Sequence, residues 1–277
     1  MLVVVGAFFA RPALFGTPSS SVVVAGVPIP VGDQPGWVNG TPLTGGAGGD
    51  TRDIWPPVPP DARSRPIGAP GPRLSWSNDY VFMSTIPEAG GRPVSWDPCR
   101  PIHLVVNNAE APAGADLLLR EAAASVTKAT GLQFVIEATS TETPSTHRAP
   151  VDNARYGNRW SPVLVGWTDP SVVPELEGRV AGVAGPTGAS YYTPTQQHWV
   201  SGTVNLDGPA FREILTRPDG WAAARAIVMH ELGHLVGLDH APVQGELMYE
   251  KNLGQLAFGP GDLEGLRQLG LGPCFTS

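Results

Sequence analysis

The stretch HELGHLVGLDH, residues 230–240, decides the fold expected for this chain of 277 residues. It overlaps the end of a longer segment, residues 220–236, whose side chains are apolar on nearly every side of a helix. Asp219 stands where a helix cap is expected, and Gly237 stands where the helix should end. A helix that is apolar all round lies inside a domain, so we expect this one to be central.

The polar side chains of this helix therefore need a chemical reason. His230 and His234 are four residues apart and face the same way, so both imidazoles can reach one metal ion at about 2.0–2.1 Å. Gly237 permits a left-handed turn that brings His240 back to the same ion. Three histidines leave a fourth position open, which is typical of catalytic zinc. Glu231 is placed to act as general base on a bound water.

A bare match of this kind can also be a solvated helix face, but here it falls on an apolar helix. Met248, in GELMYE, follows His240 by eight residues, where a tight turn can place its thioether beneath the metal site. Together, HELGHLVGLDH and ELMYE resemble the metzincin clan of zinc endopeptidases, whose pattern is HExxHxxGxxH followed by a Met-turn. GLDH (237–240) and LMY (247–249) are most similar to the matrixin branch.

This resemblance implies an α+β catalytic domain with a twisted, mixed and mostly parallel sheet that has an antiparallel edge strand. It also implies two long helices and a small C-terminal subdomain after Gly237. The implied activity is hydrolysis of peptide bonds in an extended protein or peptide substrate, which would lie along the edge strand at Val183, Ala184 and Gly185. We expect one catalytic zinc ion. No dedicated calcium-binding loop is visible.

The chain also departs from the matrixin pattern. Ala241 and Glu250 stand where matrixins usually have Ser and Pro, so the primed-side specificity pocket is expected to differ. Cys99 lies in DPCRP and not in a cysteine-switch motif, which leaves a thiolate on zinc as a minor alternative for this residue. Three other histidines lack the spacing of a second zinc site: His103, His147 and His198.

Cys99 and Cys274 are the two cysteines of the chain, and they stand near the two ends of the expected domain. A disulfide between them would stabilise the fold by about 4–5 kcal/mol in the chain-entropy model. The alternative is a pair of buried free thiols. Residues 2–10 are an apolar run too short to span a membrane but long enough for the core of an export signal. We therefore expect a protein that is secreted or associated with the cell envelope.

Glycine and proline, at 34 and 30 residues, are concentrated near the N-terminus. We divide the chain into an apolar segment at 1–26 that could be a truncated export signal, a Pro/Gly-rich linker or pro-like segment at 27–95, and the catalytic domain at 96–277. The net charge of −7 and the lack of basic runs argue against nucleic acid as a partner. No membrane span is expected, and we expect a monomer.

Hydrophobic periodicity predicts the elements of the catalytic domain. Strands are expected at residues 102–107, 132–138, 163–168, 180–184 and 199–206, and helices at 113–130, 220–236 and 260–269. Two other functions compete with the peptidase. One is a zinc-binding but non-proteolytic cell-surface module, against which Glu231 argues because metal binding alone needs no adjacent carboxylate. The other is a hydrolase of non-peptide substrates that uses the same zinc-bound water.

Overall fold

The computed structural model describes residues 56–74, 76–190, 196–251 and 254–274. Of the preceding chain it describes only the backbone of four short strands, which pair as two antiparallel hairpins: β1 (Ser21–Val24) with β2 (Val27–Pro30), and β3 (Trp37–Val38) with β4 (Thr41–Pro42). The apolar run expected to belong to an export signal, residues 2–10, lies outside the described residues. Among the described residues, no helix is both long and apolar enough to cross a membrane.

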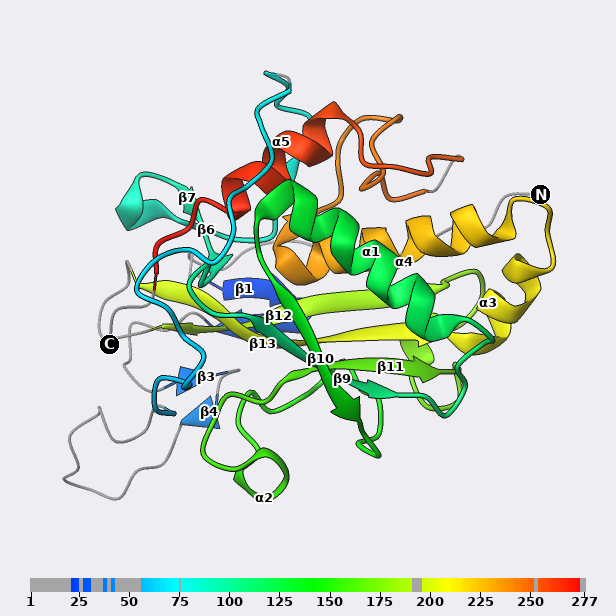
Figure 1. Ribbon diagram of the computed structural model, residues 1–277, viewed down its shortest axis with the longest axis horizontal. Helices are drawn as coiled ribbons and strands as arrows, with labels where there is room; N and C mark the ends of the chain where they lie inside the picture. Colours follow the sequence, from blue (N-terminus) through cyan, green and yellow to red (C-terminus); the bar gives the residue numbers. More distant parts are fainter. Residues whose placement is uncertain are drawn as a thin grey trace, which may run out of the picture.

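A central sheet forms the frame of the domain (Figure 1). Its main strands follow the order β10-β9-β11-β13-β12 and have these bounds: β9 (Ile102–Asn107), β10 (Phe134–Thr139), β11 (Val163–Thr168), β12 (Gly182–Ser190) and β13 (Gln197–Asp207). All these pairings are parallel except that of β12 with β13, which is antiparallel. The expected α+β class with a mostly parallel sheet is therefore confirmed.

Helices cover one face of this sheet. Figure 1 shows α1 (Ala115–Thr130), α4 (Gly220–Val236) and α5 (Pro260–Leu269) on the same side of the strands, whereas the short α2 (Asn153–Tyr156) lies on the other side. α1 ends at Gly131, which has a φ of 78° that suits glycine. α4 is fully buried along most of its length, as expected for a helix without a polar face.

Three differences from the expected elements concern β12, α3 and the start of α4. β12 extends to Ser190 because its Gly- and Pro-containing second half still pairs with β13. The helix α3 (Gly208–Leu215) was not expected, although Asp207 caps it by accepting a hydrogen bond from the Ala210 amide. Asp219 occupies the N-cap position of α4, but its side chain makes no capping hydrogen bond.

Residues 80–96, which we call the strap, pack onto the domain. The sequence pattern placed the start of the domain at residue 96. The strap contains four two-residue strands: β5 (Val81–Phe82), β6 (Thr85–Ile86), β7 (Arg92–Pro93) and β8 (Ser95–Trp96). Ile86 is fully buried and Val94 is 2% exposed, so both belong to the core. Strands of two residues are too short to show a hydrophobic periodicity, and two of them, β5 and β8, pair with segments far away in the chain.

The disulfide between Cys99 and Cys274 is confirmed. Its two Cα atoms are 5.4 Å apart, within the usual range, and it joins the chain just after the strap to the chain just after α5. The segment that precedes the strap also contacts α5, since Arg73 forms an ion pair with the buried carboxylate of Glu264. The N-terminal and C-terminal parts of the folded unit are thus tied to each other.

Candidate metal centre

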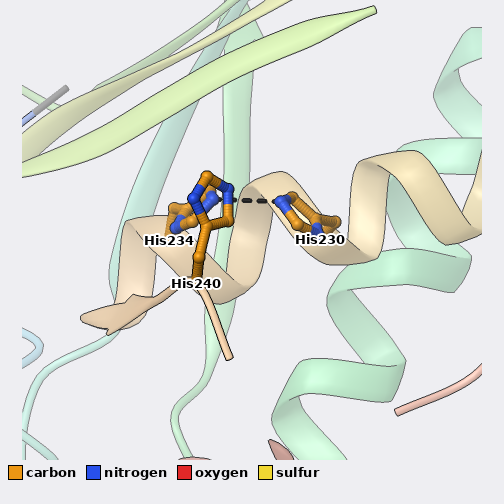
Figure 2. Close-up of side chains that lie close together, drawn as sticks. All are labelled: His230, His234 and His240. Carbon is orange, nitrogen blue, oxygen red and sulfur yellow. Dashed lines mark hydrogen bonds between the residues drawn. The ribbon is translucent and has the colours of Figure 1, made fainter. Parts of the chain in front are cut away.

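Three histidines converge at the C-terminal half of α4. His230 and His234 lie one turn apart on the helix, and His240 follows the short strand β14 (Leu238–Asp239). Figure 2 shows their imidazoles turned toward one another, two from the helix and one from the chain after it. One nitrogen from each ring lies within 4.8 Å of the other two, and the Nε2 atoms of His230 and His234 are 3.0 Å apart.

The second ring nitrogen orients two of these imidazoles. His230 Nδ1 donates a hydrogen bond to the Leu247 carbonyl at 2.7 Å, and His234 Nδ1 donates to the Leu238 carbonyl at 2.8 Å. A carbonyl oxygen can only accept, so each Nδ1 carries the proton and each Nε2 keeps its lone pair. Metal-ligating histidines commonly have such partners, which hold the ring and fix its tautomer.

The local electrostatics also suit metal binding. Burial and the neighbouring His240 lower the pKa of His230 to about 3. Burial together with both other imidazoles lowers the pKa of His234 well below its ordinary value. Burial also lowers the pKa of His240, although Asp239 and Glu250 nearby oppose this effect. The rings are therefore neutral at ordinary pH, as metal ligands must be. In a tetrahedral zinc site the nitrogens are about 3.3 Å apart. The Nε2 atoms of His230 and His234, at 3.0 Å, are close to that spacing, and a nitrogen of His240 lies within 4.8 Å of both, so the three residues fit zinc.

Gly237 provides the turn that brings the third histidine into place. Its φ is 117°, in the left-handed region that favours glycine, and its amide donates to the carbonyls of Gly233 and His234. A Cβ at this position would also lie 2.8 Å from Nε1 of Trp199. Backbone conformation and packing therefore both require glycine here, in agreement with the predicted helix break.

Glu231 lies on α4 beside the edge strand of the sheet. Its side chain is 1% exposed, and burial raises its pKa to about 8. A Cβ on Gly182, the first residue of β12, would lie 2.7 Å from Cγ and 2.9 Å from Oε1 of Glu231. The carboxyl group therefore occupies the space that a side chain at the start of β12 would take. A cation held by the adjacent histidines would favour its ionised form.

Met248 is 1% exposed and packs against α4 between the two helical histidines. A Cβ on Gly233 would lie 2.5 Å from its Sδ atom, so the fourth position of HELGH must be glycine for the turn to approach the helix. The expected position of this thioether below the histidines is consistent with that contact. The preceding residue, Leu247, supplies the carbonyl that orients His230.

Two buried carboxylates, which sequence analysis missed, hold this turn. Asp262 at the start of α5 accepts hydrogen bonds from the amides of Leu247 at 2.6 Å and Met248 at 3.3 Å. In return, Glu246 accepts from the amides of Gly261 at 3.0 Å and Asp262 at 2.9 Å. Burial, with Glu246 close by, raises the pKa of Asp262 to about 7. Glu246 and Asp262 are 16 residues apart in the chain, so local sequence does not reveal this pairing and the fold does.

The candidate substrate strand stands at the edge of the sheet, as expected. Val183, Ala184 and Gly185 lie on β12 and pair with β13, which leaves the other side of β12 without a neighbour in the central sheet. All three residues are buried in the structure. The N-terminal strands β1 and β3 lie beside β12, so part of the chain preceding the domain adjoins this edge.

The other histidines are not brought to the metal centre. His103 lies on β9, and its two ring nitrogens are each 2.8 Å from a carboxylate, that of Asp61 and that of Glu137. His147 is exposed in the loop before α2, and His198 is buried on β13 with a pKa lowered to about 4, chiefly by burial. These three residues do not form a second metal cluster within the described residues.

Comparison with known proteins adds no assignment. The chain matches no protein-family model, and it shows no significant similarity to a curated protein. The function of this site therefore has to be inferred from its geometry and chemistry.

Proposed function

We propose that this protein is a zinc-dependent endopeptidase of the metzincin type, most similar to matrixins. The observation that supports this best is the convergence of His230, His234 and His240, with Glu231 on α4 beside the edge strand β12 of the central sheet. Three neutral imidazoles favour zinc among the common divalent cations, and such a site keeps a position open for water or substrate.

The residues of the site divide the chemistry between them. When bound, a zinc ion would polarise a carbonyl and lower the pKa of a bound water toward about 7. Glu231 accepts the proton of the attacking water on its carboxylate and later delivers it to the leaving amine. His230 and His234 would keep their Nε2 lone pairs available to a bound ion, because their Nδ1 protons are engaged by backbone carbonyls.

An extended polypeptide suits the surroundings of this site. β12 is an edge strand whose first residue touches Glu231, so a peptide that added to this edge would pass beside the base. Pairing through main-chain hydrogen bonds binds many sequences, and side-chain pockets then select among them. The disulfide is consistent with a secreted or cell-envelope protein, where oxidising conditions preserve such bonds.

The test is proteolysis of denatured casein by the full chain, purified under oxidising conditions. We expect cleavage that stops when a zinc chelator is added and returns when zinc is restored. Cleavage that ignores the chelator would contradict a metal-dependent mechanism. A chain that binds zinc but cleaves neither casein nor a peptide library would favour the non-proteolytic binding module instead.

The contact between Gly182 and Glu231 gives a finer test of the proposed base. In Gly182→Ala the new Cβ would lie within 2.9 Å of three Glu231 atoms, so the carboxyl must move. A displacement of about 1 Å at a reacting group can lower the rate by about 100-fold, which is the loss in kcat we expect. Zinc content should remain stoichiometric, since no ligand moves. Unchanged kcat in a folded variant would contradict this position for the base.

A further inference from the structure

The strap contacts the C-terminal end of α4, where the chain turns from the second histidine to the third. Trp96 Nε1 donates a hydrogen bond to the Leu235 carbonyl at 2.8 Å in a buried setting. The Met83 amide donates to the Gly237 carbonyl at 2.9 Å. The last carbonyls of a helix have no partners within the helix. The strap therefore supplies hydrogen-bond donors to the Leu235 and Gly237 carbonyls at the end of α4.

The strap also forms a two-stranded sheet with the segment that leads to His240. Phe82 pairs with Leu238 and Val81 pairs with Asp239, antiparallel. Leu238 is the residue whose carbonyl accepts the hydrogen bond from His234 Nδ1. The same short strand therefore orients one histidine and carries the next one, and the strap holds that strand.

Both ends of the strap are attached to rigid parts of the domain. At its C-terminal end, Trp96 pairs with Trp199 as β8 runs parallel to β13. At its N-terminal end, the Tyr80 hydroxyl accepts a hydrogen bond from Gln268 Nε2 at 2.6 Å on α5. The strap can thus transmit the position of the sheet and of α5 to the turn after α4.

We propose that the strap, residues 80–96, is a positioning element of the metal centre, with Trp96 and Met83 as its positioning residues. Neither residue is one of the three candidate ligands. They act by holding the Leu235 to Asp239 backbone, and hence His234 and His240, in the geometry that one ion requires. This inference rests on the proposed zinc site. It adds that zinc binding depends on residues outside the HELGHLVGLDH motif.

The chain offers a matched control for Trp96. Trp199 is a neighbouring tryptophan on the paired strand, 2% exposed, and its Nε1 has no hydrogen-bond partner among the described residues. Trp96→Phe and Trp199→Phe remove the same ring volume from the same region. Only Trp96→Phe removes a hydrogen bond to the end of α4.

The experiment measures metal binding by the full chain. Zinc affinity is measured by competition with a chromophoric chelator, and coordination geometry by the visible spectrum of the cobalt-substituted protein. Mutations of the groups that orient metal ligands weaken metal binding about 10–100-fold, and we expect about tenfold for Trp96→Phe, with a changed cobalt spectrum. Trp199→Phe should weaken zinc binding less than Trp96→Phe, because the Trp199 ring packs beside Gly237 but makes no hydrogen bond to the end of α4.

Met83→Pro is the second variant. It removes the amide that donates to the Gly237 carbonyl and replaces no side chain of the metal centre. It should also weaken zinc binding and alter the cobalt spectrum. Circular dichroism of the metal-free proteins identifies the folded variants to be compared. Equal losses in both tryptophan variants, or normal zinc binding in Trp96→Phe and Met83→Pro, would overturn the proposal. Failure of the unmodified chain to bind zinc would instead overturn the proposed function.

Discussion

Replacing Glu231 by glutamine is expected to abolish most turnover while the protein keeps its metal. The amide has nearly the same shape as the carboxyl group, so the buried contact with Gly182 is retained. It cannot accept the proton of the attacking water, and general acid–base groups contribute about 10²–10⁴-fold to rate. We therefore expect kcat for casein or a peptide substrate to fall about 10³-fold, with metal content unchanged.

The matched control for this substitution is Glu246→Gln, a change of the same type at another buried carboxyl. Glu246 accepts hydrogen bonds from the start of α5 and acts on the site only through the turn that follows it, so its loss should lower thermal stability more than kcat. Full activity in Glu231→Gln would show that the proposed base is wrong. Loss of zinc in that variant would show that Glu231 supports the metal site and not the reaction.

Replacing His234 by alanine is expected to remove both the metal and the activity. Each ligand of a zinc site contributes several kcal/mol of the binding free energy, so losing one of three should weaken zinc binding at least about 1,000-fold. The substitution also removes the donor that satisfies the buried Leu238 carbonyl. Metal analysis after dialysis and the casein assay measure the two losses separately.

His103→Ala is the control for that experiment. His103 lies on β9 beside Asp61 and Glu137, and it is not part of the cluster around α4. The His103→Ala variant should retain zinc and activity. Stoichiometric zinc in His234→Ala would contradict the assignment of this histidine as a ligand, whatever the activity of the variant.

Local sequence was sufficient to predict the elements that contain the site. α4 and α5 have the expected bounds, because each has a helical hydrophobic pattern with a start or stop residue at its ends. The spacing of His230, His234 and His240 predicted their convergence, since an i, i+4 pair on a helix and a left-handed glycine leave little freedom. The pairing of Cys99 with Cys274 also followed from their number and positions.

Long-range contacts decided what the sequence could not. No periodicity marks the strap, and the contacts of Trp96 and Met83 with the end of α4 join segments more than a hundred residues apart. Asp262 and Glu246 likewise form their hydrogen bonds only because α5 lies against the turn that contains Met248.

The sequence by itself thus determined the order of the three histidines, Glu231 and the glycine turn on and after α4, because short-range backbone geometry specifies their arrangement. The tertiary structure alone decided how these residues are held: by the carbonyls of Leu238 and Leu247, and by the strap and α5, which in turn hold those carbonyls. The physical reason is that backbone carbonyls and amides are present at every residue, so no pattern of side chains shows which of them will meet.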